Sequence, residues 1–361
     1  MIGKTLFDLI KLAADFGLTI QREDGSFPPG HNGPYFDQET PVRNTGHWII
    51  TFLKIYEING DSKFLDGAHK AVNFLLSEKA RPMKAAFWHR KNLENDFSNG
   101  LIGQAWSMEA LSVAAEYFDN PDILETAHHV FLMHPFDEKQ GLWRRIGVDG
   151  SYLSIDGTFN HQLWFAAAGV LLEKHSKNDE IDKRLNLFMK NVAENLSLYP
   201  SGLISHQLRS RNLAQRVKRL LRLSDHFPRK EIKYKAVGYH PFNLYAFALL
   251  KDSFPNHSFW ESRKFKALWV YANTEKYRKE LGKSKFGYAY NPPGFEMPFA
   301  LEIFGGQMPD RREKQEKWLT EQIRLCFDFD SGLMIKGTKD PETHSARIYE
   351  ATRLPDLKIN L

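Results

Sequence analysis

The sequence predicts an all-α fold of about twelve helices, arranged as six helical hairpins that close into a toroid. Three observations predict it. Apolar residues recur at helical spacing in paired segments, short turns alternate with long loops between these segments, and one helix is left over at the C-terminus. Because each hairpin buries its apolar face against its neighbours, residues 1–361 can form a single domain.

The helical segments follow one another in a regular order. The first helix is expected at about residues 4–16. Five hairpins follow, at about residues 48–58 with 63–76, 100–117 with 121–133, 158–173 with 179–196, 241–251 with 257–271, and 295–304 with 310–327. A last helix at about 344–353 can pack beside the first and close the ring.

The loops between hairpins share a glycine followed by an apolar residue. Glycine at these positions permits the positive φ that ends a helix. The four segments are Asp24-Gly25-Ser26-Phe27, Gln140-Gly141-Leu142-Trp143, Ser201-Gly202-Leu203-Ile204 and Ser331-Gly332-Leu333-Met334. Since long and short loops alternate, the toroid should have two unequal faces, with a cleft on the long-loop face.

Composition limits the possible functions. The single cysteine, Cys326, excludes an intramolecular disulfide and a thiolate zinc site. No apolar stretch reaches the ~18 residues of a membrane span, and Asp8 stands where a signal peptide is apolar, so a cytoplasmic protein is expected. No metalloprotease, P-loop or dinucleotide motif is present, so no metal and no cofactor are expected.

The order of outer helix, Asp24-Gly25-Ser26-Phe27-like turn, polar loop and inner helix resembles the (α/α)6-toroid carbohydrate enzymes. These include unsaturated glucuronyl hydrolases, N-acylglucosamine 2-epimerases and the helical domain of glucuronyl C5-epimerases. The resemblance covers nearly the whole chain, but it includes no complete catalytic signature of any of these families. It implies a toroid that acts on a sugar, and the fold alone does not specify the reaction.

In such a toroid the N-terminal ends of the inner helices meet the long loops, and their free N–H groups suit carboxylate ligands. The densest cluster of polar residues precedes the third inner helix. Asp156 is a candidate general acid or base, and the resemblance to glucuronyl hydrolases, which use an aspartate, points to the same residue. His161 and Gln162 would orient a sugar, with Asn160 and Trp164 beside them. Alternatively, Asp156 caps the helix.

A second cluster is Tyr239, His240 and Asn243, with Pro241 expected in the first turn of a helix. A Tyr/His pair can transfer protons near neutral pH. The 2-epimerases of this fold use paired histidines as acid and base, which supports the same role. Alternatively, the segment is a capped helix start with a packed tyrosine.

Arg43 and His47 precede the first inner helix, and Arg43 could bind a uronate carboxylate through two hydrogen bonds. The loop at 28–37 is too long and irregular to be a plain connector. Glu296 is a second candidate carboxylate, or an ordinary partner of a helix N-terminus.

His344, Arg347 and Glu350 share one face of the last helix, as substrate-binding residues or as an intrahelical ion pair. Four inner helices therefore begin near a histidine, and these four histidines are expected to share one cavity: His47, His161, His240 and His344.

A basic insertion at about 209–235 interrupts the repeat. It holds ten Lys or Arg against two acids, within a net charge of +5. Its amphipathic part, 211–222, could lie on an anionic membrane at the inner face of the membrane, bind an acidic polysaccharide, or form a solvated outer face. Nucleic-acid binding is not expected, because no aromatic platform is interleaved with the charges.

Together these patterns predict a carbohydrate-active enzyme whose partner is an acidic, uronic-acid-containing oligosaccharide or polysaccharide. The leading prediction is a glycoside hydrolase that uses Asp156, or else Glu296, as its acid/base. One alternative is an epimerase with Tyr239, His240 and His161 on opposite faces of a sugar carbon. Another is a non-catalytic accessory protein of polysaccharide biosynthesis, which would hold glycan or lipid-linked glycan and dock through 209–235.

Overall fold

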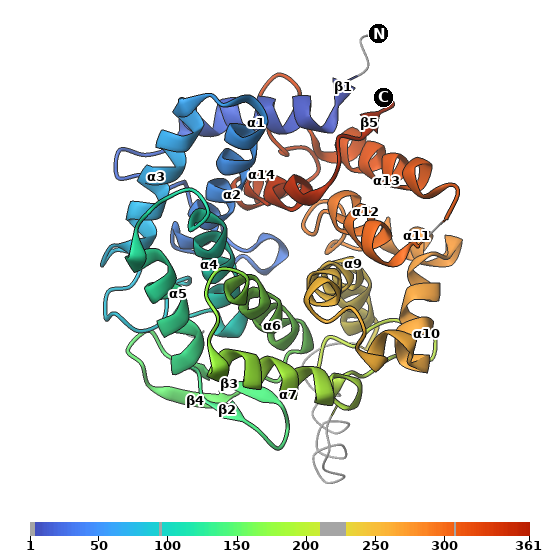
Figure 1. Ribbon diagram of the computed structural model, residues 1–361. Helices are drawn as coiled ribbons and strands as arrows, with labels where there is room; N and C mark the ends of the chain where they lie inside the picture. Colours follow the sequence, from blue (N-terminus) through green and yellow to red (C-terminus); the bar gives the residue numbers. More distant parts are fainter. Residues whose placement is uncertain (1–3, 94–95, 210–228, 307) are drawn as a thin grey trace.

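The computed structural model describes residues 4–93, 96–209, 229–306 and 308–361, and its helices form two concentric rings (Figure 1). The inner ring consists of α2 (Val42–Asn59), α4 (Gly100–Ala114), α6 (Phe159–Glu173), α9 (Arg229–Ser253), α12 (Pro293–Phe304) and α14 (Pro341–Ala346), which continues into the 3-10 helix η3 (Arg347–Arg353). The outer ring consists of α1 (Leu6–Ile20), α3 (Ser62–Leu76), α5 (Pro121–Met133), α7 (Asp179–Asn195), α10 (Arg263–Ala272), α11 (Glu275–Leu281) and α13 (Arg311–Cys326).

The inner ring is closed. Each inner helix contacts the next in chain order, from α2 through α4, α6, α9 and α12, and η3 contacts both α12 and α2. The predicted toroid of helical hairpins is therefore confirmed. Two short 3-10 helices, η1 (Gly33–Tyr35) and η2 (Ser258–Glu261), lie in the connections.

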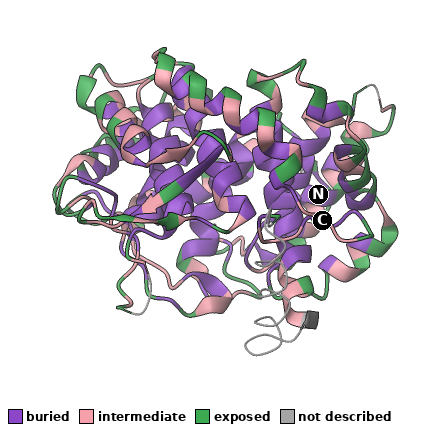
Figure 2. Cartoon of the chain, turned by 90° about the horizontal axis from the view of Figure 1, so that it is seen from below, coloured by how far each residue is buried: buried purple, intermediate pink, exposed green. Residues whose placement is uncertain are grey.

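The two rings differ in how their residues are buried (Figure 2). In α4 every residue except Val113 is buried, and in α6 every residue except His161 and Leu171. A helix that is apolar on all sides is stable only where other elements surround it, whereas a helix with one apolar stripe suits the outer ring. The helix α3 is of the second kind, with Phe64, Ala68 and Ala71 turned inward.

The glycines of the repeated loop signature have the predicted positive φ. Gly25 has a φ of 85° and Gly202 a φ of 94°. A Cβ atom on Gly25 would lie 2.1 Å from the carbonyl oxygen of Lys70, and one on Gly202 would lie 2.4 Å from that of Ala267. Glycine therefore lets the long loops approach the backbones of the outer helices α3 and α10.

The two ends of the chain meet, as Figure 1 shows. Strand β1 (Lys4–Thr5) pairs antiparallel with β5 (Lys358–Ile359), and α1 contacts η3. The predicted packing of the C-terminal helix beside the N-terminal one is confirmed, and the strand pair adds to it.

A small sheet between α5 and α6 was not predicted. Strands β2 (Phe136–Asp137), β3 (Leu142–Ile146) and β4 (Tyr152–Ile155) form an antiparallel meander in that order. Here the second of the Gly-apolar loops, at 140–143, leads directly into β3. Because β4 ends at Ile155, the sheet positions Asp156 at the start of the segment that leads into α6.

The start of the fourth inner helix was predicted wrongly. Pro241 lies inside α9 and does not begin it. A proline within a helix leaves the carbonyl four residues earlier without its usual donor. In this structure the Tyr277 hydroxyl donates to that carbonyl, the Val237 oxygen, at 3.1 Å, so the helix continues through Pro241.

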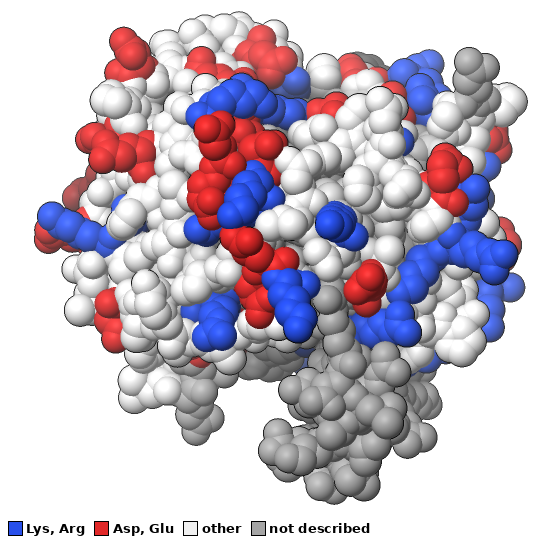
Figure 3. Space-filling model, turned by 60° about the horizontal axis from the view of Figure 1, so that its bottom comes forward, with Lys and Arg blue, Asp and Glu red and all other residues white. Residues whose placement is uncertain are grey.

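Acidic and basic side chains are intermixed on the face shown in Figure 3. Two of the ion pairs on α7 are Lys183–Glu138 at 2.5 Å and Arg184–Glu180 at 2.6 Å. The amphipathic basic stretch at 211–222, on which the membrane-contact hypothesis depends, lies outside the described residues. Among the described helices, none combines the length and the apolar character that a membrane crossing needs.

Candidate functional site

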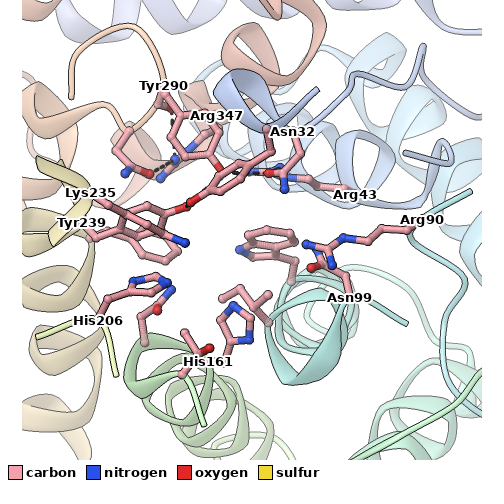
Figure 4. Close-up of a pocket in the computed structure, with 17 residues that line it drawn as sticks. Asn32, Arg43, Arg90, Asn99, His161, His206, Lys235, Tyr239, Tyr290 and Arg347 are labelled. Atoms are coloured by element: carbon pink, nitrogen blue, oxygen red, sulfur yellow. Dashed lines mark hydrogen bonds between the residues drawn. The ribbon is translucent and has the colours of Figure 1, made fainter. Parts of the chain in front are cut away.

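A cavity of about 130 Å³ lies inside the ring, where the long loops meet the inner helices (Figure 4). Five residues predicted to act in the site line it: Arg43, Asn160, His161, Tyr239 and Arg347. Residues that were not predicted to act there also line it: Asn32, Tyr35, Arg90, Asn99, Ile102, Trp106, Thr158, His206, Lys235, Phe242, Tyr290 and Asn291.

Asp156 and His161 form a dyad at this cavity. The Oδ2 atom of Asp156 lies 2.8 Å from Nδ1 of His161 and accepts from the backbone N–H of Leu101 at 3.3 Å. Its Oδ1 atom accepts from the backbone N–H of Thr158 at 3.0 Å. Asp156 itself is buried and lies behind the cavity, whereas the His161 side chain is 22% exposed and lines it.

The environment keeps Asp156 ionised. Burial would raise the pKa of this carboxyl, but the neighbouring His161 and the backbone donors outweigh burial and lower the pKa to about 2. An ionised carboxylate only accepts hydrogen bonds, so Nδ1 of His161 carries the proton in this contact, and Nε2 is the ring nitrogen that can accept a proton from a substrate. Asp156 therefore has no proton to donate near neutral pH, and His161 is oriented as a base.

His206 is a second imidazole on the wall. Its carbonyl accepts from the backbone N–H of Phe159 at 2.9 Å, which ties this loop to the start of α6. The ring packs edge-on against Tyr239 at 4.9 Å between centroids, and its buried Nδ1 atom has no hydrogen-bond partner among the described residues. Burial, and then the nearby Lys235, lower the pKa of His206 well below its usual value, so the ring is neutral.

Lys235 points into the same space (Figure 4). Its ammonium lies over the rings of Tyr35 and Tyr239, at 4.8 and 5.7 Å from their centroids. Within the described part of the chain, no carboxylate lies within ion-pairing distance of it. Burial, and then the positive charge of Arg90, lower the pKa of Lys235 to about 8.

Three tyrosines form a hydrogen-bonded row along the wall. The hydroxyls of Tyr35 and Tyr239 lie 2.9 Å apart, and that of Tyr239 donates to Tyr290 at 3.3 Å. Tyr290 then donates to Oδ1 of Asn32 at 2.7 Å. Burial raises the pKa values of Tyr35 and Tyr239 well above the usual range, so both phenols stay protonated and serve as hydrogen-bonding groups.

Arg43 lines the cavity, but much of it is bound within the protein. Its Nη1 atom donates to Oδ1 of Asn32 at 3.1 Å and to Glu39 at 3.2 Å, and the guanidinium lies 4.0 Å from the Trp106 ring centroid. The sequence predicts that Arg43 binds a uronate carboxylate through two hydrogen bonds. Because Glu39 already accepts from this guanidinium, fewer of its N–H groups are available to a substrate.

Arg347 is bound in a similar way. It donates to Glu350 at 2.7 Å, to Glu296 at 2.9 Å and to the carbonyl of Tyr290 at 3.1 Å, and also to Asn291. The sequence left two interpretations of the last helix, a substrate-binding face or an intrahelical ion pair. Arg347 and Glu350 do form an ion pair, which is buried and does not lie at a solvated helix end.

Glu296 does not line the cavity. It is fully buried behind Arg347. Burial, and then the neighbouring Glu350, raise the pKa of Glu296 well above its usual value. As a proton donor to substrate it is out of reach, because the arginine separates it from the cavity.

Three of the four histidines expected in one cavity lie elsewhere. His240 is inside α9, accepts from the backbone N–H of Ile204 at 3.3 Å and contacts the carbonyl of Leu268 at 3.1 Å. His344 contacts the carbonyl of Met334 at 3.2 Å, and His47 stacks on Tyr349 at 4.2 Å. His240 lies within α9 and not before its first turn. Its ring faces the outer helix α10 and does not line the cavity.

Three other predicted binding residues support the site from behind. Gln162 accepts from the backbone N–H of Trp143 at 2.9 Å and donates to its carbonyl at 2.8 Å. The Trp164 indole donates to the carbonyl of Phe242 at 3.2 Å. Asn243 donates to the carbonyl of Tyr239 at 2.8 Å, one turn back in the same helix.

The residues that sequence analysis missed come mainly from loops. Asn32 and Tyr35 belong to the irregular loop at 28–37, whose length was a usable signal. The Asn99-Gly100 pair at the start of α4 was a second signal, since both residues favour left-handed backbone. Arg90 and His206 had no local signal. Among the described residues, no group of three or more His, Cys, Asp or Glu side chains is arranged to hold a metal ion.

Comparison with known proteins gives one match in sequence and several in fold. No protein-family model matches the chain. Archaeal glycosylation protein Q of Haloferax volcanii is 45% identical over 373 residues, covering 99% of each chain.

Among solved structures, a D-mannose isomerase matches with a TM-score of 0.67 and 13% identity, over 96% of this chain and 95% of the other. Cellobiose 2-epimerase from Bacillus thermoamylovorans matches at 0.66 and 11%, over 96% and 98%. An unsaturated glucuronyl hydrolase specific for heparin matches at 0.62 and 12%, over 96% of each chain. At these identities the structures establish a shared fold, which confirms the resemblance to toroid carbohydrate enzymes.

Proposed function

The chain belongs to the family of archaeal glycosylation protein Q, and we propose that it is an epimerase or isomerase of an acidic sugar used in glycan metabolism. One observation carries the proposal. His161, held by the ionised Asp156, faces a one-sugar cavity whose described lining includes four cationic side chains and no carboxylate. Enzymes of the same fold include a D-mannose isomerase and a cellobiose 2-epimerase, which supports proton transfer on a sugar carbon.

The proposed chemistry uses groups already on the cavity wall. Nε2 of His161 takes a proton from a carbon next to the carbonyl of the open-chain sugar. The C–H electron pair becomes the C=C bond of an enediol, while the carbonyl oxygen takes a proton from the Lys235 ammonium. Return of a proton to the former carbonyl carbon gives the isomer, while the hydroxyl on the other carbon gives its proton to the Lys235 amine and becomes the new carbonyl. Return of a proton to the original carbon from its other face gives the epimer, while the hydroxyl formed from the carbonyl gives its proton back to Lys235. His206 also lies on the wall, but its neutral ring has no proton to give, so the proton for that face comes from solvent.

The size and charge of the cavity define the proposed substrate. A volume of about 130 Å³ holds on the order of ten water-sized positions, which suits one sugar residue. The cations on its wall are Arg43, Arg90, Lys235 and Arg347. The three arginines are each paired with an acid outside the lining, whereas Lys235 has no such partner among the described residues. An acidic sugar, free or at the end of an oligosaccharide, complements this wall better than a neutral one does.

Glycoside hydrolysis, the leading expectation from the sequence, has less support. It needs a carboxylic acid that protonates the leaving oxygen. Asp156 is ionised near neutral pH, and Glu296 is sealed behind Arg347. A protein that only binds glycan needs no base, so a non-catalytic role does not explain the Asp156–His161 dyad.

Hydrogen exchange from solvent tests the proposal. The protein is incubated in D₂O with glucuronic, galacturonic and mannuronic acids, and proton NMR follows deuterium incorporation and the appearance of new isomers. We expect exchange with at least one of them and a loss of about 10²–10⁴-fold in His161→Asn, because the amide cannot accept the proton. Full activity of that variant, or hydrolysis of an acidic disaccharide without any exchange, would refute the proposal.

A further inference from the structure

The side-chain amide of Asn99 lies in the cavity wall and makes no hydrogen bond to a described residue. It is 1% exposed, and neither its Oδ1 nor its Nδ2 atom has a hydrogen-bond partner among the described residues. It stands at the start of α4, but its side chain does not cap the helix. Buried amides are normally satisfied, so one that lines a cavity with both of its polar atoms unused indicates a ligand.

The backbone around Asn99 places this amide next to the dyad. Asn99 has a φ of 58°, and Gly100 has a φ of 57°. A Cβ atom on Gly100 would lie 2.6 Å from Oδ2 of Asp156 and 3.3 Å from Nδ1 of His161. Two successive left-handed residues therefore let the chain pass close to Asp156 and present the preceding amide to the cavity.

Arg90 belongs to the same corner of the site (Figure 4). Its backbone N–H donates to the carbonyl of Phe97 at 3.0 Å, which holds the two arms of the loop together two residues before Asn99. Its Nε atom lies 2.9 Å from Oδ2 of Asp37, which fixes the direction of the guanidinium. Its side chain is 20% exposed and lines the cavity, so the guanidinium is accessible to a ligand there.

We propose that Arg90 and Asn99 form the subsite that binds the acid group of the sugar, an inference that rests on the proposed function. The Nη–H groups of Arg90 bind the two oxygens of a carboxylate, which match the planar guanidinium better than a tetrahedral phosphate does. Nδ2 of Asn99 donates to the same group, and Oδ1 accepts from a sugar hydroxyl. A neutral sugar offers the Arg90 guanidinium no carboxylate, so the subsite selects for the acid.

Binding measurements with matched sugars test this subsite. Isothermal titration calorimetry compares glucuronate and galacturonate with glucose 6-phosphate and glucose, on the wild type and on Arg90→Gln, Asn99→Asp, Lys235→Gln and Arg144→Gln. Asn99→Asp has nearly the same shape, tolerates left-handed backbone and adds a like charge. Arg144 is an exposed arginine on β3 and serves as the control. Circular dichroism establishes that each variant is folded.

We expect the wild type to bind at least one uronate more tightly than glucose and glucose 6-phosphate. Arg90→Gln and Asn99→Asp should each weaken uronate binding about 10- to 100-fold, as expected for the loss of charge-assisted hydrogen bonds, while Arg144→Gln leaves it unchanged. Equal binding of uronate and glucose, or no uronate binding at all, overturns the subsite. So does a loss confined to Lys235→Gln, which would place the acid group at the lysine.

The two proposals fail separately. If uronate binds through Arg90 and Asn99 but exchanges no hydrogen in D₂O, the subsite stands and the proposed reaction is wrong. If a sugar exchanges hydrogen at the same rate in wild type and in Asn99→Asp, the reaction stands and the subsite is wrong.

Discussion

Two clusters of buried charge lie inside the same ring, and they are built in opposite ways. Around η3 the charges are closed on one another: Arg347 binds Glu296 and Glu350, and Arg353 binds Glu109 at 2.8 Å. Some carboxylate oxygens of that cluster lack a hydrogen-bond partner, but each carboxylate has an arginine beside it. In the cavity, by contrast, Lys235 has no acid beside it within the described residues, and neither polar atom of the Asn99 side chain has a partner there.

The difference distinguishes charged groups that stabilise the fold from polar groups that are available to bind a ligand. A buried arginine that is already paired with carboxylates cannot bind a substrate without weakening those ion pairs. A buried polar group without a partner lowers stability until something binds it. The closed cluster should therefore respond to mutation through stability, and the open cluster through binding and catalysis.

The largest stability effect is expected from the closed cluster. Arg347→Met removes the cation that Glu296 and Glu350 share and leaves two buried carboxyls beside each other. We expect it to lower the free energy of unfolding by about 3–5 kcal/mol, measured by urea titration at pH 7. The matched control is Arg324→Met on α13, whose pair with Glu321 is exposed, with an expected change of at most ~1 kcal/mol. Similar losses in the two variants would contradict the distinction.

The helices of both clusters were predictable from the sequence, but most of the partners of their side chains were not. The apolar pattern of α4 and α6 predicts buried inner helices because only a surrounded helix can be apolar on all sides. Arg347 and Glu350 are three residues apart, so their pairing was among the predicted alternatives.

The site was only partly predictable because half of its wall comes from loops. His161 and Asn160 sit at a helix start, where polar residues before an apolar run are visible in the sequence. Arg90 and His206 are placed at the cavity by backbone pairing with segments far away in the chain. Arg90 pairs with Glu39, and the carbonyl of His206 accepts from Phe159, which no local pattern encodes. His240 was misplaced because Pro241 normally marks a helix start, and the Tyr277 hydroxyl that compensates for it lies 36 residues further along the chain.

In the open cluster, Lys235→Met should raise stability while it removes function. Because burial lowers the pKa of Lys235 in the folded state from 10.5 to about 8, the unfolded chain binds the proton more tightly. The lysine therefore costs stability at pH 7, and this cost is relieved as the pH rises from about 8 to 10.5. We expect Lys235→Met to gain on the order of 1–3 kcal/mol at pH 7, with the gain shrinking over that window.

Urea titrations of Lys235→Met and wild type at pH 7, 8 and 9 check this prediction. In parallel, wild-type hydrogen exchange on the sugar should fall above about pH 8, where the lysine loses the proton that it donates. A stability difference that does not change with pH would mean that Lys235 is not the titrating group.

The smallest effect on stability is expected from Asn99, and it distinguishes a structural role of this side chain from a role in ligand binding. Asn99→Gly keeps a residue that adopts a φ of 58° without strain and removes an amide whose two polar atoms have no partner among the described residues. Glycine also loses more freedom on folding, so the two terms largely cancel and the free energy of unfolding should change by no more than about 1 kcal/mol. Uronate affinity, by contrast, should fall at least as far as the loss of one hydrogen bond to a charged group predicts, about 10-fold. Urea titration and calorimetry on the same preparation separate the two effects. If the free energy of unfolding falls by well over about 1 kcal/mol while uronate affinity is unchanged, Asn99 serves to hold the start of α4 and belongs with the residues that stabilise the fold.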